Sequence, residues 1–315
     1  MLIVLLVIFA IMGLLIGGIR QLSSSAQATA DKASVLSLKQ AVEQFRQQMG
    51  FLPPLMKDRG DVVSAAGPIA FDGTPPVVAG IIKVYSVTDT EDLQALRGGT
   101  NEAEPGTYSV YSEFSLPAYI LGALDMSRPA PLNNVSFDGV QGPGFRKAKP
   151  DGTFESAGAK FEPFFDVART PTAVYAEDAS TGKVQLRDRN GVAYRYYRWE
   201  HDAGQPDSGH PQVDPVLIRE GVKIYANVPR IVYDPYFAIP FGQLPAAGVQ
   251  SPRLPDEMKA AAFAIVGAGP NEVFGDEPVA ELQAKLGMTI NPGNPQDVAK
   301  LIGRASADNA VEVGR

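Results

Sequence analysis

The sequence begins with MLIVLLVIFAIMGLLIGGI, residues 1–19, a run without a charged side chain. As an α-helix rising about 1.5 Å per residue, this run would be about as long as the hydrocarbon core of a bilayer is thick. The next residues, 20–50, are more polar but contain no proline, so the same helix can continue through them. We therefore expect one long N-terminal helix over 1–50, transmembrane at 1–19 and amphipathic at 20–50.

Apolar side chains recur along one face of the amphipathic half, at steps of three, four or seven residues. They are Val35, Leu38, Val42, Phe45 and Met49. This spacing is typical of a helix that packs one face against a core. Gly50 can cap the helix, and Pro53 and Pro54 prevent its continuation. We expect this face to pack rigidly on a head formed by residues 51–315.

Small residues gather where the two halves of the helix meet. Gly13, Gly17 and Gly18 precede three serines at 23–25, and each glycine costs roughly 1 kcal/mol of helix stability relative to alanine. We expect a bend or an unwound stretch here in the assembled protein. Alternatively, the small residues let neighbouring helices approach closely.

The sequence of the head predicts short helices and strands separated by glycine and proline. We expect strands at 81–87, 172–175, 183–186, 192–199, 222–225 and 261–266, and helices at 92–96, 116–124, 278–286 and 295–302. Asn190-Gly191 predicts the turn of a hairpin over 182–199. The expected fold class is therefore α+β, with the long helix on a mostly antiparallel sheet and surface insertions at 125–165 and 200–216.

Composition restricts the function. The net charge of −7 makes a polyanion such as DNA a poor partner, and the absence of cysteine excludes thiolate chemistry. The segment 263–270 resembles a strand and G-x-G turn of a dinucleotide fold, but Glu272 stands where the third glycine is needed. No catalytic motif is present, so we expect no enzyme activity.

An acidic, glycine-containing turn at 269–277 is a candidate cation site. Its oxygen donors and those near the C-terminus are Asn271, Asp276, Glu277 and Asp308. Calcium takes six to eight oxygen ligands, including backbone carbonyls, so this turn predicts a possible calcium site. The alternative is a pair of acidic turns without an ion.

The sequence resembles the type IV pilin and type II secretion pseudopilin family. The resemblance is carried by residues 1–14, by the helix end at 41–53, by 190–197, and by 263–275 with 308–313. It implies a pilin-like head on a long helix. Family members begin with a Phe-Thr-Leu-x-Glu segment, whereas no glutamate precedes Glu43 here. We expect a leader ending in glycine and such a pentapeptide to be encoded just upstream of Met1; the alternative is that Met1 is the true start. For residues 1–28 themselves, the alternative to an uncleaved anchor is a signal peptide cleaved after Ala26-Gln27-Ala28.

By this resemblance the protein would be a structural filament subunit that polymerises through its apolar helix. Side chains expected in the filament core are Leu5, Ile8, Phe9, Met12 and Leu15. The implied partners are copies of the same chain, a prepilin peptidase, an assembly platform and an ATPase. The implied location is the bacterial inner membrane, then a periplasmic or extracellular filament. The alternative function is a membrane-tethered head that binds a ligand or envelope component and does not polymerise.

Overall fold

The computed structural model describes residues 2–56, 111–123, 138–140, 142–149, 152–178, 183–198, 231 and 261–314. Within the first helix, the described side chains begin at Ala26. In chain order the elements are α1 (Leu2–Met49), β1 (Tyr111–Ser112), a π-helical turn η1 (Pro117–Leu121), a 3-10 turn η3 (Val167–Arg169), β2 (Thr172–Asp178), β3 (Lys183–Asp188), β4 (Arg195–Arg198), β5 (Phe263–Gly267), a 3-10 turn η7 (Gly269–Asn271), α4 (Val279–Leu286), α5 (Pro295–Ser306) and β6 (Ala310–Gly314).

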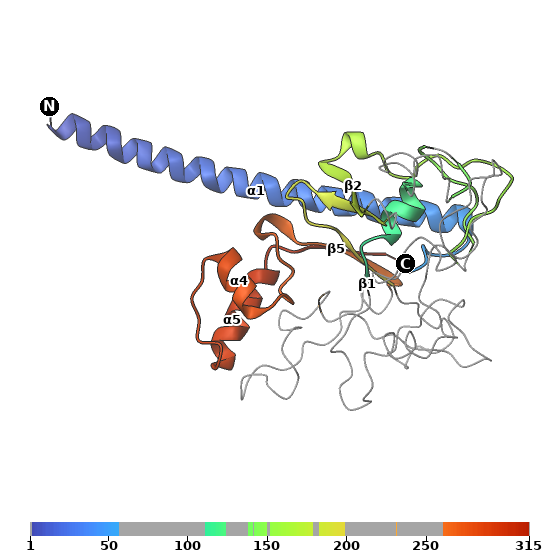
Figure 1. Cartoon of the computed structure of the whole chain (residues 1–315). Coiled ribbons are helices and arrows are strands. Elements are labelled where there is room, and N and C mark those ends of the chain that lie inside the picture. The colour runs from blue at the N-terminus through green and yellow to red at the C-terminus, as the bar shows by residue number, and fades with distance from the viewer. Residues whose placement is uncertain are drawn as a thin grey trace.

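Helix α1 runs without interruption and dominates the shape of the molecule. Its first half extends away from the head, and its second half lies on it (Figure 1). The helix ends where Gly50 takes a φ of 86° and its N–H donates to the carbonyl of Arg46 at 2.8 Å. The helix is also continuous at 13–25, so the expected interruption stays a prediction for the assembled state.

The expected membrane-spanning half of this helix is not supported. Among the described residues, no helix is both long and apolar enough to cross a bilayer. The described side chains of α1 include the charged residues Asp31, Lys32, Lys39, Glu43 and Arg46. These charges lie in the half that the sequence already predicted to be amphipathic. On the finding that no described helix can cross a bilayer, our pilin-like fold class with a transmembrane helix is corrected to an α+β fold without one in the described part.

The described strands form two antiparallel sheets. The larger has the order β1-β4-β5-β6, and the smaller pairs β2 with β3. Strand β5 is buried along its whole length, which explains its continuous apolar sequence. Alternate residues of β5 face two different cores: Phe263 and Ile265 join the core that contains α1, whereas Ala264 and Val266 join a second core on the other face.

The Asn190-Gly191 turn joins two sheets instead of forming one long hairpin. Strand β3 pairs with β2, and β4 pairs with β1 and β5. Around the turn, the end of β3 and residues 192–194, which precede β4, share a bridge between Arg187 and Ala193 and two backbone hydrogen bonds between the arms. The expected hairpin over 182–199 was therefore right about the turn and wrong about the pairing of its arms.

Some of the other expected elements agree with the structure, and others lie outside the described residues. Segments 172–175, 183–186 and 263–266 lie in strands, 278–286 and 295–302 coincide largely with α4 and α5, and 116–124 contains the π-helical turn. The expected strands at 81–87 and 222–225, the helix at 92–96 and the expected insertion at 200–216 lie outside the described residues. The expected surface insertion at 125–165 is wrong over its described part, because Phe145, Ala148 and Phe154 are buried in the main core. Helices α4 and α5 lie between β5 and β6 along the chain and form a small lobe beside the sheet (Figure 1), with its own apolar cluster around Leu282 and Leu301.

Candidate functional site

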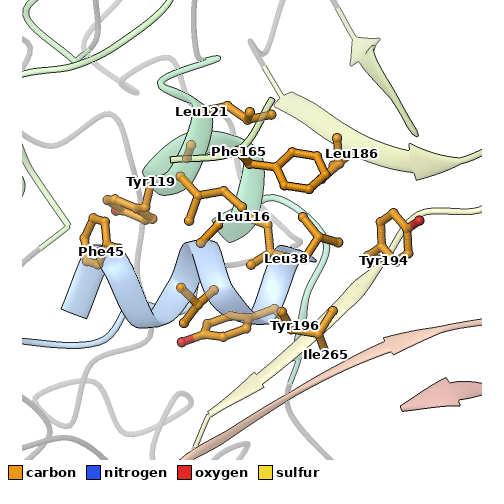
Figure 2. Close-up of a cluster of buried hydrophobic side chains, with 14 of the residues drawn as sticks. Leu38, Phe45, Leu116, Tyr119, Leu121, Phe165, Leu186, Tyr194, Tyr196 and Ile265 are labelled. Carbon is orange, nitrogen blue, oxygen red and sulfur yellow. The ribbon is translucent and has the colours of Figure 1, made fainter. Parts of the chain in front are cut away.

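The functional candidate that the structure builds is the seam between α1 and the head. Along the second half of α1, Val35, Leu38, Val42 and Phe45 are fully buried, and Met49 is nearly so. Leu38 and Phe45 point toward Leu116 and Tyr119 of the segment that contains η1, as Figure 2 shows. This face of α1 is therefore part of the main core of the protein.

Aromatic rings surround Phe45 from several segments of the chain. Its ring centroid lies 5.6 Å from that of Phe51, 6.0 Å from Phe164, 6.1 Å from Tyr119 and 6.4 Å from Phe145. Most of these contacts are edge-to-face, the geometry that aromatic quadrupoles favour. The packing fixes the end of α1 in both position and rotation.

The chain that follows α1 is held by hydrogen bonds from β4. The carbonyl of Pro53 accepts from the Tyr196 hydroxyl at 3.2 Å and from Arg198 Nη1 at 3.1 Å. The N–H of Met56 donates to the hydroxyl of Ser115 at 2.9 Å. These bonds pair backbone groups that burial would otherwise leave without water. The helix therefore joins the head without a flexible linker.

At the other end of the seam, where α1 leaves the head, two head segments, 188–194 and 267–271, pack against residues 31–35 of α1. We call these three segments together the collar. Residues 26–30 of α1 are exposed or half-buried, and Asp31 is the first buried residue among the described side chains of the helix. Gly267 lies between Tyr194 and Val35: a Cβ there would crowd the Tyr194 ring, at 3.2 Å, and would contact Val35 at 3.5 Å.

An ion pair fastens α1 to the collar. Arg189 Nη2 lies 3.2 Å from Asp31 Oδ2, and the Asp31 side chain is 5% exposed. In the same turn, Asp188 Oδ1 accepts from the N–H groups of Asn190 at 2.8 Å and Val192 at 2.9 Å. The Asn190 amide donates to the carbonyl of Gly269 at 3.3 Å, which links the two head segments of the collar.

The collar holds two buried carboxylates, Asp31 and Asp188, and two cations, Arg189 and the exposed Lys32. Asp188 is 4% exposed, and its burial raises its pKa, against the two backbone hydrogen bonds that lower it. The nearby Asp31 carboxylate raises the pKa of Asp188 further. Burial likewise raises the pKa of Tyr194, with a contribution from Asp188. Arg189 is thus bonded to one of two buried carboxylates.

A second ion pair joins α1 to the edge strand further along the seam. Lys39 Nζ lies 3.6 Å from Glu312 Oε2 on β6, and both side chains are partly exposed. Its contribution to stability is small for that reason. Its position shows that α1 lies along β6 as well as β5.

Three of the four candidate calcium ligands use their side chains in other contacts, and Asp308 is exposed. Asp276 Oδ2 lies 2.6 Å from Arg195 Nη1, and Glu277 accepts from the N–H groups of Phe274 and Gly275 at 2.8 and 2.7 Å. The Asn271 amide donates to the carbonyl of Ala305, and the carbonyl of Asp308 lies against Gly269. In the described part of the chain, no three acidic or histidine side chains are grouped to hold a metal. Calcium binding stays an untested prediction.

Arg195 connects this acidic turn to the sheet. Its guanidinium carbon lies 3.8 Å from the ring centroid of Phe274 and 4.5 Å from that of Tyr111. The side chain is 9% exposed and paired with Asp276. A buried guanidinium between two rings and a carboxylate is a structural clamp, which accounts for the acidic residue at 276 without an ion.

The expected filament-core residues, Leu5, Ile8, Phe9, Met12 and Leu15, lie in the part of α1 whose side chains are outside the described set. Sequence reasoning did not single out Asp31, Asp188 or Arg189. One signal was available: an aspartate two residues before Asn190-Gly191 is typical of a side chain that caps its own turn. No local signal paired Arg189 with Asp31, 158 residues away.

Comparison with known proteins found no match: no family model, no curated protein and no solved structure matches this chain.

Proposed function

We propose that this protein is a structural subunit of a helical filament of the type IV pilus or pseudopilus kind, and that it polymerises through the apolar first half of α1. The observation that carries the proposal is the arrangement of α1. Its second half is buried in the head, while residues 2–30, about 40 Å of helix at 1.5 Å per residue, precede Asp31, the first buried residue among the described side chains, and the helix extends away from the head (Figure 1).

The apolar sequence supports self-association of the extended part. Residues 1–19 hold no charged side chain, and burying one large apolar side chain is worth roughly 1.5 to 3 kcal/mol. Copies of the chain can bury these residues against one another, because each copy presents the same helix. The heads would then lie outside a core that contains Leu5, Ile8, Phe9, Met12 and Leu15.

The firm attachment of α1 favours this function over a tethered ligand-binding head. A tether commonly places Gly, Ser or Pro residues between an anchor and its head, whereas here one helix passes directly into the core. A rigid subunit transmits the position of its helix to its head, as a regular filament requires. By the resemblance, a peptidase, a platform and an ATPase would assemble it into a periplasmic or extracellular filament, and the chain itself would catalyse no reaction.

Shearing of cells that express the full chain, followed by negative-stain microscopy and immunolabelling, tests the proposal. We expect labelled filaments from the unmodified chain and none from Ile8→Asp or Met12→Asp. Tyr175→Asp is the control, because Tyr175 is an exposed side chain on β2, 48% accessible, where a charge should be tolerated. Normal filaments from both helix variants would overturn the proposal, and a chain found only as single anchored heads would support the tethered alternative.

A further inference from the structure

The collar holds a buried carboxylate whose charge is not balanced by a direct partner. Asp188 bonds through Oδ1 to two backbone N–H groups, whereas Arg189 bonds to Asp31. An ionised carboxylate in a buried position is costly unless a cation compensates it. Ionisation of Asp188 therefore disfavours the packing of the two head segments of the collar on α1. The two backbone hydrogen bonds that Asp188 Oδ1 accepts favour this packing.

The groups that face Asp188 come from each segment around it. They are Asp31 on α1, with exposed Lys32 beside it, Arg189 in the same turn, and Tyr194 before β4. Strand β2 places Thr172 opposite Asp188, and residues 267–271 carry no charged side chain. Among these charged groups, Asp31 contributes to the raised pKa of Asp188 through the repulsion between the two carboxylates.

We propose that the collar is a pH-sensitive latch on α1, in which protonation of Asp188 tightens the hold of the head on the helix and ionisation loosens it. A proton on Oδ2 leaves Oδ1 free to accept both backbone hydrogen bonds and removes the repulsion from Asp31. The helix residues affected are those around Asp31, at the base of the extended half. This inference does not depend on whether the protein polymerises.

The direction of the pH dependence of the collar's stability follows from proton linkage. The pKa of Asp188 is raised in the folded state above its ordinary value of 3.8. A group of this kind adds stability that is fully present below the ordinary value and is lost as the pH rises through the folded-state pKa. The collar should therefore be closed more firmly in mild acid than near neutrality.

Hydrogen exchange of the full chain measures this opening directly. Amides in 26–38 and 186–194 are compared at about pH 4, near the ordinary carboxyl pKa of 3.8, and at about pH 7, after correction for intrinsic exchange. We expect stronger protection at the lower pH in the unmodified chain, and loss of this difference in Asp188→Asn, with protection at both values like that of the acid form.

Asp166→Asn is the matched control. Asp166 also accepts a hydrogen bond from a backbone N–H two residues later, that of Ala168 at 3.0 Å, but its side chain is 54% exposed. It should leave the pH difference at the collar unchanged. An unmodified chain without the difference, or Asp188→Asn that retains it, would overturn the proposal. If Asp188→Asn does not fold, Asp31→Asn decides: a reduced difference supports the latch, and an unchanged one contradicts it.

Discussion

The guanidinium of Arg189 lies 3.2 Å from the carboxylate of Asp31, across 158 residues of sequence. This pair joins the turn between the two sheets to the place where α1 emerges from the head. It is the polar counterpart of the apolar packing around Phe45 at the far end of the seam. Together the two contacts hold the second half of α1 at both ends, so the direction of the extended half is set by the head.

Replacing Arg189 should loosen the emerging end of α1. Arg189→Gln leaves the Asp31 carboxylate buried without its ion pair, which should lower the free energy of unfolding in urea by about 1 to 3 kcal/mol. Adding Asp31→Asn should recover part of this loss, because the uncompensated charge is then removed. Arg169→Gln is the control, since its pair with Asp166 is exposed and contributes little. Equal effects of the two arginine variants would contradict the role of the collar.

Truncating the Phe45 side chain should lower the free energy of unfolding more than Arg189→Gln does. Phe45→Ala removes a fully buried ring that touches rings of four other residues, so we expect a loss of about 3 to 5 kcal/mol of unfolding free energy. Gln47→Ala, an exposed change two residues further along α1, should alter it by no more than about 0.5 kcal/mol. Thermal or urea unfolding of the full chain measures both. An unchanged transition for Phe45→Ala would refute the docking of the helix on the head.

Gly269 should tolerate no side chain. It has a φ of 70°, and a Cβ there would overlap the carbonyl of Asp308. The left-handed conformation alone costs an L-residue roughly 1 to 2 kcal/mol. Gly287→Ala is a matched control, because Gly287 has a φ of 61° but open space around its Cα. We expect Gly269→Ala to lower the melting temperature clearly more than Gly287→Ala, and similar shifts would show that the close approach to Asp308 is unimportant.

Calcium should have little effect on the melting temperature. Asp276 is paired with Arg195, and Glu277 caps the turn at 274–275, so binding would require these contacts to break. Binding to the folded state stabilises it by mass action, which makes melting a sensitive test. We expect the same melt in millimolar calcium and in excess chelator. A rise with calcium that Asp276→Ala abolishes would instead establish the cation site.

Local patterns were enough to predict those parts of the fold that depend on nearby residues. The buried face of α1, its end at Gly50, the turn at Asn190-Gly191 and the helices α4 and α5 each follow from spacing, caps or turn residues within a short window. The transmembrane assignment of 1–19 is corrected, because no helix among the described residues is long and apolar enough to cross a bilayer. The apolar run by itself did not determine where such a helix lies.

The sequence by itself determined the long helix, its packing face and the turns, because these depend on periodicity and on backbone preferences of single residues. Only the tertiary structure decided that β3 and β4 belong to different sheets, that Asp276 pairs with Arg195, and that Arg189 meets Asp31. The physical reason is that strand partners and buried ion pairs are selected by the shared core, whose packing joins residues far apart along the chain.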